Sequence, residues 1–185
     1  MKNRAKLTYN YEVLNYEAVV EVLDTEGHEA AYTRHERVRF LQDDVLILDD
    51  YGWGNGIAFA AHEVYPGEFV KREMTGSRLR STVRLPQPYN EGDEMTLSVE
   101  RMIKNGFVSP SECWLEAELY HEVRHVLLKV ILPAGRPVRA ARLVFPGLAG
   151  SETLDVVPLP DGRQSISYED GDPVQGRRYT VLWHW

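Results

Sequence analysis

Apolar and polar residues alternate with a period of two along most of the chain, and turn residues separate the alternating runs. In residues 17–23, the apolar side chains Ala18, Val20 and Val22 point to one side of the chain. The polar residues 24–27 then have the composition of a hairpin connection to a returning strand over 29–41. The same pattern predicts shorter strands over 45–48, 57–61, 68–73, 78–85, 95–99, 140–145, 153–159 and 164–168.

The last seven residues, 179–185, form a clear amphipathic strand. Tyr179, Val181, Trp183 and Trp185 share one face, which we expect to lie in the core because large aromatic side chains contribute strongly to burial. His184 lies on the opposite face, where we expect it to be half exposed.

The spacing of these strands is typical of β-sandwiches and barrels. The sequence therefore predicts a single all-β domain over residues 1–185, an antiparallel sandwich or open barrel of about nine to twelve short strands with at most one helix. Asn105-Gly106 is a strong signal for a type I′ hairpin turn.

The segment 109–132 fits two descriptions. Residues 109–112 (Ser-Pro-Ser-Glu) resemble a helix capping box, and apolar residues after them recur at helical spacing. Leu115, Ala117 and Leu119 also alternate with polar and aromatic neighbours, and 126–132 is rich in aliphatic residues. We favour a β-hairpin of two strands joined near 122–124, with the helix as the alternative.

Composition and charge narrow the classes of function. The net charge of −7 argues against binding to nucleic acid, which depends on clustered lysines and arginines. Cys113 is the only cysteine, so no intramolecular disulfide or thiolate metal site can form, as is usual in a reducing compartment. Neither a signal peptide nor an apolar run of ~18 residues is present in the sequence. We expect a soluble, cytoplasmic protein that does not bind membranes.

Residues 121–125 read His-Glu-Val-Arg-His, a literal match to the H-E-x-x-H zinc motif. On a helix, His121 and His125 would lie on one face and share a zinc ion, while Glu122 would deprotonate a zinc-bound water. The sequence resembles the zincin metallopeptidases over these five residues. A third ligand would have to come from the last part of the chain, where the candidates are Asp155, Glu169, Asp170, Asp172 and His184.

Two features weigh against this hypothesis. Arg124 would place a cation close to the metal, at a position where the zincin pattern has an uncharged residue. In a strand or turn, moreover, the motif has no reason to converge on a metal ion. We therefore expect an accidental match, with no catalytic residue, no metal ligand and no cofactor unless the helix is present.

Residues 49–56 contain an acidic pair and three glycines, together with Tyr51 and Trp53. Such a segment can form an oxygen-rich calcium site, although it lacks the alternating Asp/Asn and terminal Glu of an EF-hand loop, or a loop that contacts a ligand, with Tyr51 and Trp53 as the contact residues. Turn chemistry alone also explains its glycines and aspartates.

The C-terminal half resembles accessory all-β domains that are attached to bacterial signalling and conflict proteins. The resemblance rests on Gly92-Asp93 before the strand 95–99, on Trp114, on the strand 127–133 followed by Arg136-Pro137, and on the closing Gly176, Tyr179, Trp183 and Trp185. It implies a β-sandwich that senses or docks, usually beside an effector domain.

The hypothesis that follows is a non-enzymatic recognition module, which binds a protein partner or a small-molecule ligand, in bacterial signalling or defence. A small zinc hydrolase built on His121, Glu122 and His125 is the first alternative. A β-barrel carrier of a small apolar ligand is the second, since the chain has ten Tyr, five Phe and four Trp. The sequence leaves the oligomeric state and the identity of the ligand open.

Overall fold

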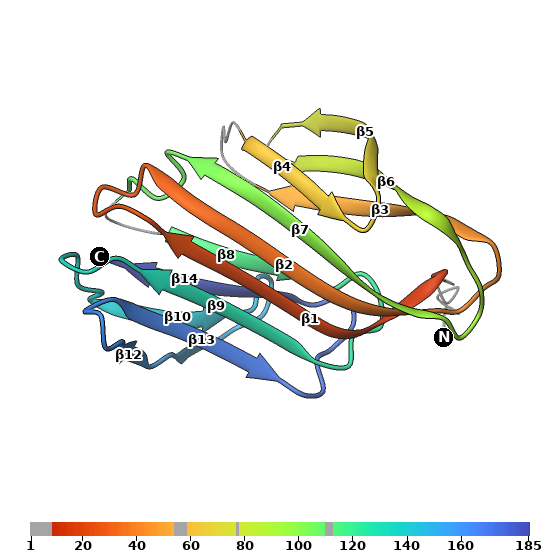
Figure 1. Ribbon diagram of the computed structural model, residues 1–185. Coiled ribbons are helices and arrows are strands. Elements are labelled where there is room, and N and C mark those ends of the chain that lie inside the picture. The colour runs from red at the N-terminus through yellow and green to blue at the C-terminus, as the bar shows by residue number, and fades with distance from the viewer. Residues whose placement is uncertain (1–8, 54–58, 77, 110–112) are drawn as a thin grey trace.

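The computed structural model describes residues 9–53, 59–76, 78–109 and 113–185. In these ranges the chain forms fourteen strands and no helix, so the predicted all-β class is confirmed (Figure 1). The number of strands is higher than the nine to twelve expected. Nowhere in the described ranges is there a helix that could cross a membrane.

The strands form three sheets. The largest has the order β12 (Val156–Pro158), β13 (Gln164–Asp170), β9 (Val126–Leu132), β1 (Tyr11–Val22), β2 (Glu29–Phe40), β7 (Glu94–Lys104) and β4 (Phe59–Tyr65). The second has the order β11 (Ser151–Thr153), β10 (Ala140–Val144), β14 (Arg178–His184) and β8 (Cys113–Glu118). The third has the order β3 (Val45–Trp53), β6 (Arg78–Tyr89) and β5 (Glu68–Thr75).

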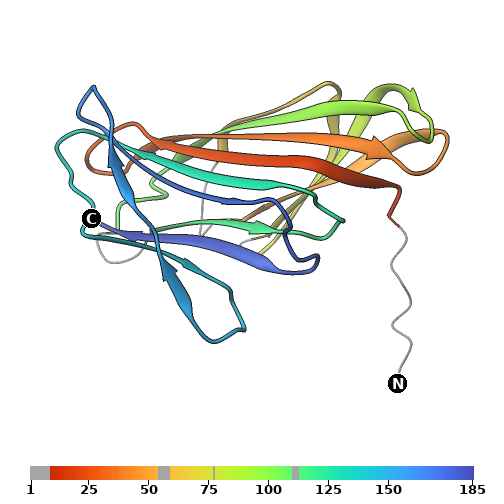
Figure 2. The same cartoon turned by 90° about the horizontal axis from the view of Figure 1, so that it is seen from below.

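The seven-stranded sheet forms one layer, and the four-stranded sheet lies against one of its faces (Figures 1 and 2). The three-stranded sheet packs near β7 and β4, and its residue Asp50 reaches Arg34 and Arg101 on β2 and β7. Strands β8 and β3 each have one hydrogen-bonded neighbour, β14 and β6 respectively. The two smaller sheets are therefore not joined to each other.

Burial follows the predicted alternation closely. On β2, every second residue from Ala30 to Phe40 is buried, and the same holds on β9 from Val126 to Leu132. The C-terminal prediction is also confirmed, because Tyr179, Val181 and Trp183 are fully buried and Trp185 is 5% exposed.

The segment 113–132 forms two strands, β8 and β9, as favoured, but they do not form a hairpin. Strand β8 pairs with β14 in the four-stranded sheet, whereas β9 pairs in parallel with β1 and antiparallel with β13 in the large sheet. The chain therefore crosses from one layer to the other through residues 119–125. Residues 110–112, on which the predicted capping box depends, lie outside the described residues.

Four predictions differ from the structure. Asn105 has the positive φ of 57° expected of its turn signal, but the next strand is β8 in another sheet, so no hairpin forms there. The predicted strand 153–159 is divided between β11 and β12, which belong to different sheets. Residues 49–53, expected in a loop, are part of β3 because they pair with β6. The pairing of β1 with β9 is parallel, unlike the antiparallel arrangement expected throughout.

Candidate functional site

Residues 121–125 form a non-helical connection between β8 and β9, with a single bridge residue at Val123. Val123 makes a parallel bridge to Val13, and backbone hydrogen bonds join Val13 N to Glu122 O (2.8 Å) and Arg124 N to Val13 O (3.0 Å). Because this backbone is not helical and bends at His121 and Arg124, the two histidines are not held one turn apart on a common face as they would be on a helix. The zincin alternative requires a helix at this position, and the structure has none.

The two histidines of this segment have different surroundings. His121 packs against the rings of Tyr11 and Tyr9, with ring centroids 3.9 and 4.4 Å apart. Burial lowers the pKa of His121 to about 4, although Asp49 opposes the shift, so the imidazole is neutral at pH 7. His125 instead lies within hydrogen-bonding distance of Asn15 Oδ1 (2.6 Å) and Glu169 Oε1 (2.8 Å).

Arg124, the residue that departs from the zincin pattern, has a structural partner. Its guanidinium donates to both carboxylate oxygens of Glu12, with the shortest distance 2.9 Å. Glu122 itself is exposed. The four polar residues of the motif thus contact four different surroundings and do not form a common site.

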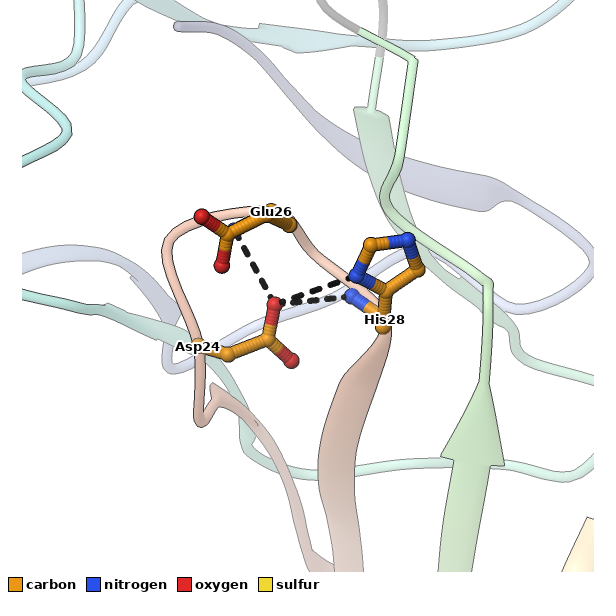
Figure 3. Close-up of side chains that lie close together, drawn as sticks. All are labelled: Asp24, Glu26 and His28. Carbon is orange, nitrogen blue, oxygen red and sulfur yellow. Dashed lines mark hydrogen bonds and ion pairs between the residues drawn. The ribbon is translucent and has the colours of Figure 1, made fainter.

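A different group of possible metal ligands occurs in the turn between β1 and β2, where Asp24, Glu26 and His28 lie close together (Figure 3). The carboxylate of Asp24 already accepts hydrogen bonds from the backbone N–H groups of Glu26, His28 and Glu29, at 2.6 to 3.0 Å. These bonds outweigh the effect of burial and lower the pKa of Asp24. The arrangement is explained by turn stabilisation.

A cavity of about 310 Å³, which we name the seam cavity, lies among the described residues. Residues of β1, β2 and β7 form its floor, while β3 lies on one side and β8 on the other. It therefore occupies the gap between the two smaller sheets, over the inward face of the large sheet. Tyr51 and His121 both line it, although the sequence assigned them to separate candidate sites.

Buried charges meet at the floor, where Asp50 reaches from β3 to Arg34 and Arg101. Asp50, 2% exposed, accepts hydrogen bonds from Arg34 Nη2 (2.6 Å) and Arg101 Nη2 (2.9 Å). Burial alone would raise the pKa of Asp50, but the two guanidinium groups outweigh it and lower that pKa. Arg101 also donates from Nε to His62 Nε2 at 3.0 Å. Gly52 leaves room for this guanidinium, because a Cβ there would lie 3.2 Å from Arg101 Cζ.

Glu36 has fewer partners than Asp50. Its residue is 9% exposed, and its carboxylate lies 3.2 Å from Arg34 Nε. That contact is not aligned as a hydrogen bond, since Arg34 Nε has no hydrogen-bond acceptor among the described residues. Burial raises the pKa of Glu36, and the nearby Arg34 offsets this only in part. Its ionised form is thus less well stabilised than that of Asp50.

Aromatic residues surround this polar floor. Tyr16 is the register partner of Glu36 on the neighbouring strand, and both Tyr16 and Tyr32 line the cavity. At the outer side, Tyr51 on β3 packs against Tyr120, which follows β8, with ring centroids 5.3 Å apart. Arg78 donates to the hydroxyl of Tyr120, so the two smaller sheets are connected here by side chains rather than by backbone pairing.

The predicted contact residues Tyr51 and Trp53 lie on β3, not on a loop. Tyr51 lines the seam cavity, whereas only the backbone of Trp53 is described, paired with Arg78. Arg34, Glu36 and Arg101 were not identified from the sequence, whereas Asp50 belongs to the acidic pair of the segment 49–56. The sequence signal for these charges is their position in the period-two alternation. Arg34 and Glu36 fall on the same face of β2 as the buried Tyr32 and Val38. Arg101 falls on the same face of β7 as the buried Val99 and Ile103.

No protein-family model matches the sequence, and no curated protein matches it. Solved structures do match the fold. The chain is similar to an M1 zinc metallopeptidase from Deinococcus radiodurans, with a TM-score of 0.54 and 12% identity, over 93% of this chain and 42% of that one. The structure of a mutant two-domain M1 zinc metallopeptidase bound to L-tryptophan matches with a TM-score of 0.55 and 13% identity, over 94% and 43% of the two chains.

At these identities the similarity establishes the fold alone. The chain spans about two fifths of the length of the metallopeptidases that it matches.

Proposed function

We propose that this chain is a non-catalytic recognition domain that binds a small molecule in the seam cavity. The observation that carries the proposal is the cavity itself, about 310 Å³, lined by aromatic rings and by charges that a domain of this size normally keeps at its surface. Ligand pockets in proteins have volumes from about 300 Å³ upwards and combine apolar walls with a few polar groups.

The two alternatives from the sequence have less support. A zinc hydrolase would need His121, Glu122 and His125 on a helix, and these residues lie in a non-helical connection. A carrier of a purely apolar ligand would have no use for Arg34, Glu36 and Arg101 at the cavity floor, where their desolvation is unfavourable.

Ligand-observed NMR with a set of neutral, cationic and anionic aromatic compounds tests the proposal. Ile103 lines the cavity and is 7% exposed, so Ile103→Trp should fill the space without changing any charge. We expect at least one compound to bind the native chain and to lose binding in the Ile103→Trp variant, provided that the variant still melts cooperatively. Binding that is equal in both proteins, or absent from both, would refute the proposal.

A second candidate function comes from the comparisons. The chain matches about two fifths of a zinc metallopeptidase described as having two domains, so we propose that it can also act as a partner domain for a peptidase-type catalytic domain. Calorimetric titration of the chain with an M1-type catalytic domain that lacks its own matching part tests this. Saturable binding supports the partner role, and the absence of heat at micromolar concentrations counts against it.

A further inference from the structure

We infer that the seam cavity recognises a small organic cation, an ammonium group carried on an apolar body, with Glu36 as its counter-ion. This inference rests on the proposed function and narrows it to one class of ligand. Three features of the cavity lead to it: the environment of Glu36, the sign of the lining charges, and the aromatic walls.

Glu36 is a buried carboxylate with hydrogen-bonding capacity left over. It makes one ionic contact, to Arg34 Nε at 3.2 Å, and its side chain is 12% exposed; no hydrogen bond to its carboxylate occurs among the described residues. Asp50, in the same cluster, accepts two strong ones. A buried carboxylate is normally satisfied by several donors. Because the Glu36 side chain lines the cavity, a donor that occupies the cavity can supply what the protein does not.

The lining charges favour a cation over an anion. Five acidic residues but only two basic ones line the cavity: Glu36, Asp49, Asp50, Glu116 and Glu118 against Arg34 and Arg101. Both guanidinium groups are already bound by Asp50. His121 adds no positive charge at pH 7, because burial keeps its pKa near 4. An anionic ligand would therefore meet an excess of carboxylates and no available guanidinium fork.

The aromatic walls suit the same class of ligand. Tyr11, Tyr16 and Tyr32 lie beside the floor, and Trp114 and Tyr120 lie toward β8. Faces of aromatic rings attract ammonium groups, and more strongly when water is excluded. The apolar body of the ligand would contact the remaining lining, which includes Val13, Phe107, Leu115 and Leu119.

The test compares 2-phenylethylamine with 2-phenylethanol, which has the same shape without the charge, and with phenylacetate, which has the opposite charge. Dissociation constants are measured by NMR titration at pH 7 with the native chain. We expect the amine to bind at least tenfold more tightly than the alcohol, and phenylacetate to bind more weakly than either.

The Glu36→Gln variant should bind the amine and the alcohol equally, within about a factor of two, because it keeps the shape and removes the charge. The matched control is Glu152→Gln, which removes an exposed carboxylate from β11 and should leave the tenfold preference unchanged. A thermal melt of each variant identifies any loss of the fold. If Glu36→Gln does not fold, Ile103→Phe, which narrows the cavity and retains Glu36, should weaken the amine and the alcohol together.

The outcomes separate the two proposals. Equal affinity of the native chain for the amine and the alcohol, or a preference for phenylacetate, would overturn the cation inference and leave a small-molecule site in place. A tenfold preference that survives in Glu36→Gln would assign the charge recognition elsewhere and also overturn it. If no compound of any charge binds the native chain, both the inference and the proposed function are wrong.

Discussion

Asp50 is the residue whose neutralisation should most strongly destabilise the protein. Its carboxylate is 2% exposed and binds Arg34 at 2.6 Å and Arg101 at 2.9 Å. Removing one partner of a buried ion pair costs about 3–5 kcal/mol, because the remaining charge stays buried without compensation. We expect Asp50→Asn to lose about that much free energy of unfolding. For a chain of this length, this corresponds to a decrease in Tm of roughly 6–20 °C.

The neighbouring residue supplies the control. Asp49 is exposed and pairs with Arg80 at 3.0 Å, where both side chains are about half exposed. Surface pairs of this kind contribute about 0–1 kcal/mol, so Asp49→Asn should change the Tm by only a few degrees. Both variants remove one negative charge from adjacent positions of β3, and any difference between them therefore reports burial. Urea unfolding of the three proteins at pH 7 gives the free energies.

The pH dependence provides an independent check on the same cluster. The two guanidinium groups lower the pKa of Asp50 in the folded protein below its ordinary value near ~3.9. The stabilisation is therefore complete above that ordinary value and is lost as the pH falls through the lower, folded-state pKa. The difference between native protein and Asp50→Asn should be constant from pH 5 to 7 and should decrease in stronger acid. A loss of less than about 1 kcal/mol at pH 7 would refute the buried ion cluster.

Three further predictions concern other parts of the chain. Deletion of residues 179–185 removes most of β14 with the fully buried Trp183, so the product should be insoluble or molten; a cooperative melt at the native Tm would contradict this. Glu122→Gln should change the free energy of unfolding by no more than about 0.5 kcal/mol, because Glu122 is exposed. The purified native chain should carry less than one zinc per molecule, and stoichiometric zinc by metal analysis would favour the zincin alternative. NMR titration of His121 should give a pKa of about 4 in the folded protein. Because the unfolded state takes up this proton at higher pH, the free energy of unfolding should decrease as the pH falls from about 6.5 toward 4. A titration midpoint near ~6.5 would disprove the burial of the ring.

The alternation of apolar and polar residues predicted where the strands lie better than it predicted which strands pair with each other. Residues 17–23 and 29–41 were expected as a hairpin and form one, because the turn at 24–27 is short and its Asp24 caps it. Residues 113–118 and 126–132 were correctly expected as strands, yet their pairing was not. Period-two alternation states which side chains share a face, but it does not state which sheet a strand joins. That choice depends on long-range contacts such as the parallel pairing of β9 with β1.

The candidate site was predicted only at its edge. Tyr51 was identified as a contact residue, and it lines the cavity, but the reason given was a glycine-rich loop over 49–56. Residues 49–53 are part of strand β3, and 54–56 lie outside the described residues. The floor was missed because charged residues were read as the solvent-facing half of each strand. Arg34, Glu36 and Arg101 instead lie on the buried face of their strands. A charged residue at such a position indicates either a buried ion pair or a binding site.

The division of the second layer into two sheets explains why a cavity exists at this place. Strands β3 and β8 are not paired with each other, so the inward face of β2 and β7 is not covered completely by apolar side chains. Replacing a buried ion cluster by well-packed apolar residues is often neutral or stabilising by about 1–4 kcal/mol. Apolar residues at positions 34, 36, 50 and 101 would therefore give a fold of equal or greater stability. The retained charges lie instead where the two sheets separate, beside open space and aromatic rings. Local departures from an otherwise consistent pattern are expected at functional sites. The position of these charges therefore supports a binding role for the seam cavity more than a purely structural one.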